Sequence, residues 1–305
     1  MKNTLIILLG PTGAGKTATS LRLAQHLSAP IISADSRQFY KDLPIGTAAP
    51  TPQQLAMAPH YMVGILGLEE YYSAAMFEAD VMALLGKLFR SQSAVILCGG
   101  SMMYIDAVCR GIDDIPNISP EIRNSLAEQY ATNGLAPMLE ELKRLDPEHY
   151  LKVDRQNYRR VLHAIEVCRQ TGRPYSSFLT FSVKQRPFDI LKVGLSLERD
   201  MLYRQINARV DGMMASGFVE EARKVYPHRH LNSLNTVGYK EMFAFFDGSC
   251  TIDEATDKIK RNTRVYARKQ MTWFKRDPNI AWFNPSRYED ITEYVDGKLA
   301  AATSA

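Results

Sequence analysis

The chain has 305 residues, of which 46% are apolar and 23% charged, and its formal net charge is +4 at pH 7. This is the composition of an ordinary soluble globular protein, long enough for one large domain or two modest ones. No apolar run approaches a membrane span and no signal peptide precedes the first predicted strand, so we expect a cytoplasmic protein without a membrane anchor. Cys98, Cys109, Cys168 and Cys250 are widely spaced, which predicts reduced thiols and neither disulfides nor a zinc site.

The first predicted strand and helix flank a glycine-rich loop. Residues 10–17 read GPTGAGKT, which fits G-x-x-x-x-G-K-[ST] in full. The apolar run 5–9 suits a buried strand and 19–27 a helix, and this context favours a phosphate-binding loop over a plain glycine turn. Such a loop turns its N–H groups inward, Lys16 adds a full positive charge, and the Thr17 hydroxyl can reach Mg²⁺. The predicted phosphate ligands are Gly10, Pro11, Thr12, Gly13, Ala14, Gly15, Lys16 and Thr17.

Further strands are predicted at 30–35, 60–66 and 94–100, with helical spacing between them, notably over 73–89. Strands and helices that alternate in this way indicate a parallel sheet covered on both faces. A strand at 190–197 is expected to rejoin that sheet. Two or three helices follow it, and 280–284 is predicted as a last edge strand.

Between these strands, residues 113–184 contain capped amphipathic helices and no convincing strand. Ser119 is a predicted N-cap with Pro120 at the first helical position, and Gly172 is a helix stop. The predicted fold is therefore α/β, a P-loop NTPase-like parallel sheet flanked by helices over 1–112 and 185–305. An all-helical insertion occupies 113–184.

The usual ligand of such a loop is ATP or GTP, and a nucleotide hydrolase would also place an Asp after an apolar strand to hold Mg²⁺. The strand 94–100 leads into Gly-Gly-Ser instead. The acid that does follow a strand is Asp35, at an edge where ligands of open α/β folds bind. There it can hold a metal-bound water, take a proton from an acceptor as in a small kinase, or merely cap the next turn.

The segment 258–276 carries eight Lys or Arg residues and no acid. Lys260, Arg264 and Arg268 recur every four residues and form one stripe of a helix. A basic stripe with interleaved aromatics suits a phosphate backbone and unstacked bases, whereas a solvated face usually mixes charges of both signs. For Tyr266 and Phe274 we favour the alternative that they point into the core. A second basic cluster lies in the insertion and comprises Arg155, Arg159, Arg160 and His163.

Together, several stretches resemble the tRNA dimethylallyltransferase family, in the order in which that family has them. They are GPTGAGKT, ISADSRQFYKDLPIGTAAP, CGGSMMYI, RRVLHAIEV, LYRQINARVDGMMASGFVEEA, TVGYKEM and TRVYARKQMTWFKR. They extend from Gly10 to Arg276, nearly the whole chain. The loop alone is unspecific, whereas ADSRQFYK, GYKE and RKQ-TWF are far more specific.

The resemblance implies that the loop holds the diphosphate of dimethylallyl diphosphate and that no nucleotide is cleaved. The prenyl group would move to N6 of the adenine 3′-adjacent to the anticodon of a tRNA, with Mg²⁺ as cofactor. Asp35 would take the N6 proton, and Thr17, Ser101 and Arg209 would complete the catalytic set. Without the resemblance, a surface ion pair would be the preferred interpretation of Arg209.

The resemblance also assigns residues to tRNA binding, and we expect a monomer of the bacterial type. The chain has Ser101 where the family often has Thr, and His163 where it usually has Arg. Close alternatives are prenyl transfer to a free adenine nucleotide, a P-loop kinase of small molecules, and a non-catalytic RNA-binding module. The implied tRNA-binding residues are Asp35, Ser36, Arg37, Gln38, Ser101, Arg123, Arg159, Arg160, His163, Asn235, Thr236, Val237, Gly238, Tyr239, Lys240, Lys269, Gln270, Thr272, Trp273, Lys275 and Arg276.

Overall fold

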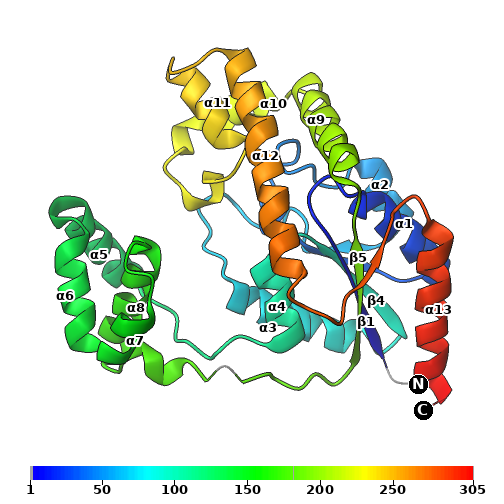
Figure 1. Cartoon of the computed structure of the whole chain (residues 1–305), viewed down its shortest axis with the longest axis horizontal. Helices are drawn as coiled ribbons and strands as arrows, with labels where there is room; N and C mark the ends of the chain where they lie inside the picture. The colour runs from blue at the N-terminus through cyan, green and yellow to red at the C-terminus, as the bar shows by residue number, and fades with distance from the viewer. Residues whose placement is uncertain (1–2, 181, 305) are drawn as a thin grey trace. The chain divides into compact units, whose positions relative to one another are not determined.

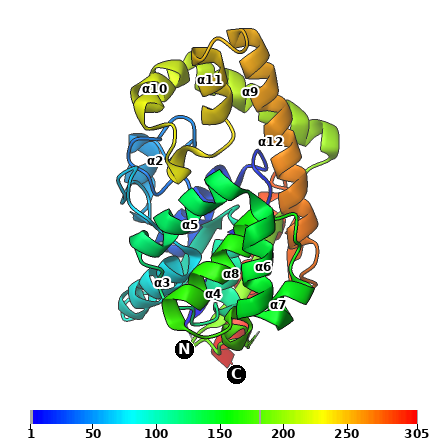
Figure 2. The ribbon, with the colours of Figure 1, turned by 90° about the vertical axis from the view of Figure 1, so that its left-hand side faces the viewer.

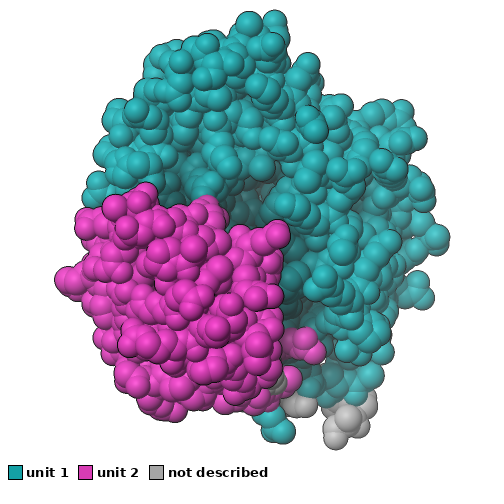
Figure 3. All heavy atoms as spheres, turned by 60° about the vertical axis from the view of Figure 1, so that its left-hand side comes forward, with its two compact units in different colours: residues 1–109, 185–305 teal, residues 110–184 magenta. Residues whose placement is uncertain are grey.

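A computed structural model describes residues 3–180 and 182–304 of the chain. The chain divides into two compact units, drawn in different colours in Figure 3. Unit 1 contains residues 1–109 and 185–305, and unit 2 contains residues 110–184. Our sequence-based boundaries for the insertion were 113–184. Among the described residues, no helix is long and apolar enough to cross a membrane.

Unit 1 is built on one parallel sheet, as the alternating pattern predicted. The order of the strands is β3-β2-β4-β1-β5-β6, and every pairing is parallel. The return of the chain through β5 and the edge position of β6 are likewise confirmed. The strands are β1 (Thr4–Leu9), β2 (Ile31–Ala34), β3 (His60–Tyr61), β4 (Ala94–Gly99), β5 (Asp189–Leu195) and β6 (Ala281–Phe283).

The strand predicted over 60–66 is wrong for most of its length, because β3 contains only His60 and Tyr61. Met62 and Gly64 take φ angles of 62° and 60°, a left-handed conformation that a strand cannot continue through. Leu66 then forms an isolated bridge with Tyr40. The run therefore forms a turn in which Met62 and Leu66 are buried, whereas Ile65 is exposed.

Helices cover both faces of the sheet because the side chains of the central strand alternate between them. Leu5, Ile7 and Leu9 of β1 belong to a core shared with α3 (Ala74–Leu88) and α4 (Met102–Arg110). Ile6 and Leu8 belong to a second core shared with α1 (Lys16–Leu27) and α13 (Tyr288–Ser304). The sheet and these helices form the lower half of unit 1 in Figure 1.

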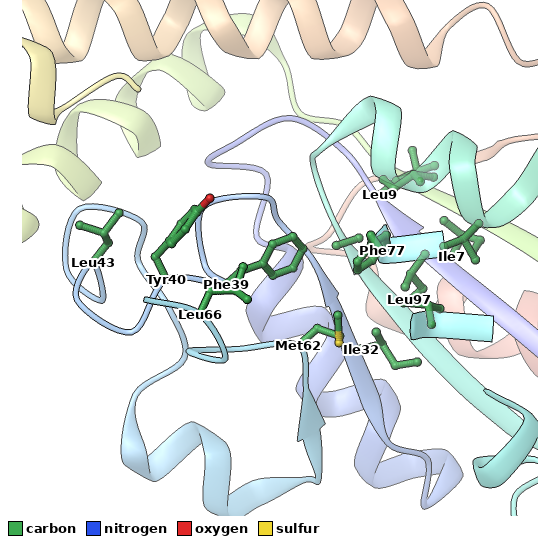
Figure 4. Close-up of a cluster of buried hydrophobic side chains, with 14 of the residues drawn as sticks. Ile7, Leu9, Ile32, Phe39, Tyr40, Leu43, Met62, Leu66, Phe77 and Leu97 are labelled. Carbon is green, nitrogen blue, oxygen red and sulfur yellow. The ribbon is translucent and has the colours of Figure 1, made fainter. Parts of the chain in front are cut away.

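The segment that follows β2 is packed firmly onto the sheet. Figure 4 shows Phe39 directed toward the cluster of buried side chains that includes Ile32 and Phe77. The ring centroids of Phe39 and Phe77 are 5.4 Å apart, and both residues are fully buried. Burial of one such ring stabilises the fold by about 1.5–3 kcal/mol. This packing limits the freedom of the backbone that carries Asp35.

Most of the remaining helices of unit 1 gather around α12, the long basic helix (Figures 1 and 2), whereas the short helix α2 contacts α1. Thr251 caps α12 in a capping box with Glu254. Contacts join α12 to α9 and α11, and α10 packs against both of these neighbours. The helices are α2 (Pro52–Met57), α9 (Arg199–Ala215), α10 (Phe218–Val225), α11 (Tyr239–Phe246) and α12 (Ile252–Phe274), with short 3-10 turns at Tyr226–His228 and Asn232–Leu234.

Unit 2 is a small helical body with its own apolar core. Its helices are α5 (Pro120–Asn133), α6 (Leu135–Leu145), α7 (Pro147–Lys152) and α8 (Tyr158–Thr171), with a 3-10 turn at Tyr175–Phe178. Leu126, Leu142 and Ile165 form the centre of that core. The predicted cap at Ser119 and the left-handed stop at Gly172 are present. No strand occurs among the described residues of this unit.

One buried carboxylate joins two segments of unit 2. Asp146 is only 1% exposed, and its Oδ1 accepts from the His149 N–H at 2.9 Å, which caps α7. The backbone N–H and the hydroxyl of Ser176 donate to the same carboxylate at 2.6 and 2.9 Å. Asp146 therefore both starts α7 and fixes the turn that follows α8.

We predict that Asp146→Ala lowers the free energy of unfolding of unit 2 by about 2–4 kcal/mol, since it leaves buried donors without a partner. Hydrogen exchange of the α6 to α8 amides measures this locally. Asp154→Ala is the control, because Asp154 is exposed and its carboxylate accepts from the Gln156 N–H, two residues away. If the α6 to α8 amides were equally protected from exchange in the two variants, Asp146 would not have the stabilising role that we assign to it.

Candidate active site

The loop between β1 and α1 has the backbone of a phosphate-binding loop. Gly13 and Gly15 both take φ angles of 82°, a conformation that side chains disfavour. A Cβ at Gly10 would lie 2.7 Å from the Leu195 carbonyl oxygen, so only glycine fits beside β5. Gly15 is the N-cap of α1 and carries no capping side chain, which leaves the first N–H groups of the helix to bind an anion.

The side chain of Lys16 folds back onto this loop and contacts its backbone. Its Nζ donates to the carbonyl oxygens of Gly10 at 3.1 Å and Pro11 at 2.9 Å. Burial lowers its pKa from 10.5 to about 8, with the positive charge of Arg209 acting in the same direction and Cys98 and Asp35 opposing. The ammonium is still charged at neutral pH, and its partial desolvation strengthens attraction to an anion.

A buried amide connects the loop to α12. The Thr12 N–H donates to Gln270 Oε1 at 2.9 Å, and Gln270 Nε2 donates to the Gly100 carbonyl oxygen at 2.8 Å. Gln270 is 2% exposed. Sequence reasoning placed Gln270 among the tRNA contacts; in the structure its side chain is enclosed between the loop and the end of β4.

Asp35 lies directly after β2, at the carboxyl edge of the sheet. Its Oδ1 accepts from the Arg37 N–H at 3.0 Å, so the carboxylate does cap the following turn. The same residue also borders two cavities. The capping role and the chemical role proposed from the sequence are therefore compatible, because a carboxylate has a second oxygen for a ligand.

Ser101 and Ser36 form a hydroxyl pair beside Asp35. Ser101 Oγ accepts from the Ser36 N–H at 2.8 Å and lies 3.2 Å from Ser36 Oγ. Ser101 is buried, and its own N–H donates to the Ala34 carbonyl oxygen. The pair thus joins the ends of β2 and β4 and holds the backbone on both sides of Asp35.

Arg209 projects from α9 toward the same region. Its Nη2 donates to the Thr47 carbonyl oxygen at 3.2 Å. Burial lowers the pKa of its guanidinium, and the negative charge of Asp35 opposes that shift. Without the resemblance, the sequence favoured a surface ion pair for Arg209, whereas in the structure its guanidinium donates to a neutral carbonyl. A partly desolvated arginine with a neutral partner is suited to bind an anion.

A small cavity of about 90 Å³, the inner cavity, lies between the loop and α9. Polar residues such as Asp35 and Arg209 line part of this cavity. Apolar side chains from α9, α12 and the 235–238 segment line much of the remainder. Sequence reasoning did not identify Val210, Met213 and Ile259, since on a helix they look like ordinary core positions, and it assigned Val237 to tRNA binding. The lining residues are Thr12, Asp35, Arg37, Gly46, Thr47, Arg209, Val210, Met213, Thr236, Val237, Gly238, Ile259 and Thr263.

A larger cavity of about 410 Å³, the outer cavity, borders the inner one. Asp35, Arg37, Thr236 and Val237 line both, so Asp35 lies where they meet. Lys240 and Lys269 at its lining are exposed cations. The lining residues are Asp35, Ser36, Arg37, Asn235, Thr236, Val237, Lys240, Glu241, Asn262, Val265, Tyr266 and Lys269.

Tyr266 lines the outer cavity and is 37% exposed, so the prediction that it points into the core is wrong. Burial raises the pKa of its hydroxyl to about 12, and the negative charge of Asp35 adds to that shift. Phe274 is 3% exposed, as predicted. The spacing of residues along α12 predicts its buried and exposed faces only approximately, and Tyr266 lies at the border between these two faces.

Several other residues assigned to tRNA binding form contacts within the protein. Tyr239 is fully buried and donates to Glu221 at 2.6 Å. Trp273 Nε1 donates to Asp106 at 2.8 Å. Gln38 accepts from Ser33 and donates to the Thr47 and Ala48 carbonyl oxygens. The remaining members of the α12 end are exposed, namely Thr272, Lys275 and Arg276.

The basic stripe of α12 is less open than its sequence suggested. Lys260 forms an ion pair with Asp211 at 2.6 Å, and Arg264 donates to Asn207 at 2.7 Å. Both partners lie on α9, so these cations join two helices. Arg268 is exposed, as is the neighbouring Lys269. Of the three cations in the stripe, Arg268 is therefore the exposed one, and Lys260 and Arg264 are half-buried.

In unit 2, Arg159 and Arg160 are exposed on α8. Arg123 and His163 both lie beside Glu166, at 4.0 and 3.6 Å. That carboxylate offsets part of the positive charge that the sequence pattern predicted for this cluster. The exposed cations of the cluster are therefore Arg155, Arg159 and Arg160.

The residues that could bind a metal at the loop are few. Thr17 is exposed at the start of α1, and no acid lies in the first turn. Within the described part of the chain, no group of three or more His, Cys, Asp or Glu side chains could hold a metal ion. Mg²⁺ often takes ligands from substrate phosphates, and a site of this kind fits the loop if phosphate oxygens supply most of its ligands.

Comparisons with known proteins agree with this geometry. A family model described as IPP transferase matches residues 38–277. A relative from Parabacteroides distasonis, named tRNA dimethylallyltransferase 2, is 62% identical over 97% of this chain and 99% of its own. One from Phocaeicola vulgatus, named tRNA dimethylallyltransferase 1, is 57% identical over 97% of this chain and 98% of its own.

Solved structures are similar as well. The tRNA isopentenylpyrophosphate transferase from Bacillus halodurans is 34% identical, with a TM-score of 0.71 and 99% of both chains covered. A eukaryotic dimethylallyltransferase solved acting on tRNA has a TM-score of 0.80, covers 97% of this chain and 80% of its own, and at 22% identity indicates the shared fold alone. The family match and the extent of these identities establish that the chain belongs to the IPP transferase family.

Proposed function

We propose that the chain transfers the dimethylallyl group of dimethylallyl diphosphate to N6 of the adenine 3′-adjacent to the anticodon of a tRNA. The observation that carries this proposal is the position of Asp35, which borders both the inner and the outer cavity. The inner cavity includes the loop residue Thr12 and the cation Arg209. The outer cavity is bordered by the basic helix α12. A donor and an acceptor that enter from different sides would meet at Asp35.

The donor would occupy the loop and the inner cavity. The loop N–H groups, Lys16 and Arg209 suit a diphosphate, and Val210, Met213, Val237 and Ile259 suit a short apolar chain. Thr17 is the residue that would hold Mg²⁺ together with the diphosphate oxygens. When bound, the metal ion would neutralise part of the charge of the leaving group.

In the reaction, the allylic C–O bond breaks and its electron pair leaves with the diphosphate. An exocyclic adenine amine is a poor nucleophile, so the bond must ionise substantially before N6 attacks. Lys16, Arg209 and the loop N–H groups stabilise the negative charge that develops. The N6 lone pair forms the new C–N bond, and the Asp35 carboxylate accepts the N6 proton. Ser101 positions the backbone beside Asp35 through Ser36.

The tRNA would lie over the outer cavity and the C-terminal half of α12. An adenine that is stacked in its loop cannot reach a recessed donor, so it must be turned out of the stack. Tyr266 offers an aromatic ring at the cavity for such a base, and Lys240 and Lys269 offer charge for the phosphates. We also propose that the protein is a cytoplasmic monomer. Every residue that lines the two cavities belongs to unit 1, so the proposed site takes no residue from a second chain.

The direct test is one incubation of the protein with unmodified tRNA, dimethylallyl diphosphate and Mg²⁺, followed by mass analysis of the nucleosides. We expect an adenosine heavier by one prenyl unit, and no product when AMP replaces tRNA. Prenylation of AMP would select a free nucleotide as acceptor. Consumption of ATP with neither acceptor changed would contradict the proposal and favour a kinase.

We predict that Asp35→Asn lowers kcat by at least about a hundredfold, since the amide cannot accept the N6 proton. The amide keeps an oxygen for the Arg37 N–H, so the dissociation constant for tRNA should change by less than about twofold. Asp42→Asn on the same loop is the control, because Asp42 is exposed. If Asp35→Asn kept a kcat close to that of the wild type, Asp35 would not be the base that accepts the N6 proton.

We predict that wild-type affinity for dimethylallyl diphosphate falls as the pH rises above about 8, where the free enzyme's Lys16 loses its proton. The sign follows from the charge, because an anion binds the protonated ammonium and is released as that charge is lost. Lys16→Met should bind weakly at every pH. Titrations between pH 7 and about 9.5 should therefore show the two affinities converging. If the ratio of the wild-type and Lys16→Met affinities stayed constant, Lys16 would not titrate in this pH range.

We predict that Lys269→Ala weakens tRNA binding and reduces the slope of log K against log salt by about 1, as expected for one lost phosphate contact. Filter binding at several salt concentrations measures that slope. Lys258→Ala is the matched control, since Lys258 is exposed in the other half of α12 and away from the outer cavity. If the two variants showed equal slopes, the RNA would not bind preferentially beside the outer cavity.

A further inference from the structure

The segment 45–47 forms part of the inner cavity and holds two side chains of the site. The Thr47 carbonyl oxygen accepts from Arg209 Nη2 at 3.2 Å and from Gln38 Nε2 at 3.4 Å. Gly46 and Thr47 themselves line the cavity. This backbone carbonyl is therefore a group that helps to hold the guanidinium of Arg209 in place.

This segment is held in turn by a carboxylate from α10. Glu221 Oε2 accepts from the Ile45 N–H at 2.7 Å, and Glu221 Oε1 accepts from the Gly46 N–H at 2.8 Å. The Tyr239 hydroxyl donates to the same Oε1 at 2.6 Å. Glu221 is 8% exposed and Tyr239 fully buried. Hydrogen bonds to a charged acceptor are the stronger kind, so the segment is fixed firmly.

Close packing against Phe218 and Tyr239 also restricts the backbone of residues 45–47. A Cβ at Gly46 would lie 2.4 Å from the Phe218 ring and 2.5 Å from the Tyr239 hydroxyl oxygen. Ala48, directly after the segment, has a φ of 47°, which a residue with a side chain rarely adopts. A strained backbone persists only where its surroundings hold it. Glu221, Tyr239 and Phe218 supply those surroundings.

The chain of contacts therefore runs from α10 to the donor site. The N–H groups of Ile45 and Gly46 face the Glu221 carboxylate, and the Thr47 carbonyl faces Arg209. The negative charge of Glu221 is satisfied by these N–H groups and by a hydroxyl, without an ion pair to Arg209. Arg209 thus keeps its charge for an anionic ligand and is still held in place.

We propose that Glu221 is a positioning residue for the transfer, which acts through the segment 45–47 to orient Arg209 toward the diphosphate. The inference rests on the proposed function, because it takes dimethylallyl diphosphate as the ligand. It assigns a role to Tyr239 as well, as the second partner of the Glu221 carboxylate.

The experiment is a double-mutant cycle on the dissociation constant for dimethylallyl diphosphate. Glu221→Gln keeps the shape of the side chain and turns an amide toward backbone N–H groups that need an acceptor. We expect it to weaken donor binding about tenfold in the wild-type background. In the Arg209→Ala background, where there is no guanidinium left to orient, the further loss should be less than about twofold. Glu220→Gln, on the exposed neighbour, should leave donor binding unchanged.

The cycle separates positioning from general stability. A tenfold loss in both backgrounds would overturn the proposal, because Glu221 would then act on the fold and not through Arg209. No loss in the wild-type background would overturn it as well. Should Glu221→Gln fail to fold, Tyr239→Phe removes one hydrogen bond of the same carboxylate and enters the same cycle with a smaller expected loss.

Failure of this inference is distinguishable from failure of the proposed function. Wild-type prenylation of tRNA and wild-type donor binding are measured first. If the wild type neither binds nor transfers the donor, the proposed function is at fault. The cycle is then repeated with inorganic pyrophosphate as the probe, and coupling between Glu221 and Arg209 in that cycle still supports the positioning role.

Discussion

The site depends on how closely the strand ends approach one another at the carboxyl edge of the sheet. A Cβ at Gly99 would lie 2.2 Å from the Ala34 carbonyl oxygen, and one at Gly10 2.7 Å from that of Leu195. Glycine at these positions allows the ends of β2, β4, β1 and β5 to lie side by side. The phosphate loop, Asp35 and Ser101 all leave the sheet at this edge, so their proximity follows from the backbone and not from side-chain contacts alone.

The second constraint is electrostatic. Lys16 and Arg209 are both partly desolvated, and burial lowers the pKa of each. Carbonyl oxygens are their hydrogen-bond partners, at Gly10 and Pro11 for the lysine and at Thr47 for the arginine. Two desolvated cations with neutral partners cost stability in the free protein, and an anion between them offsets that cost. The arrangement therefore suits an anion, such as the leaving diphosphate of the proposed reaction.

Much of this was predictable from the sequence, because the decisive features are local. The loop motif, the parallel sheet, the helical insertion and the position of Asp35 after β2 all follow from patterns within a few residues. The role of Glu221 was not predictable, since its partners Ile45, Gly46 and Tyr239 are distant along the chain. The same holds for Lys260 and Arg264, whose partners lie on another helix. Periodicity also placed Tyr266 on the wrong side, because its helix borders a cavity as well as a core.

The central claim is that donor and acceptor meet at the Asp35 carboxylate. The measurement that tests it most directly is a crystal structure of the protein with tRNA and a thio-substituted analogue of dimethylallyl diphosphate that does not ionise. The account predicts the analogue's diphosphate on the loop, with the target N6 within hydrogen-bond distance of Asp35. An adenine that lies elsewhere, or a diphosphate away from Lys16 and Arg209, would contradict it.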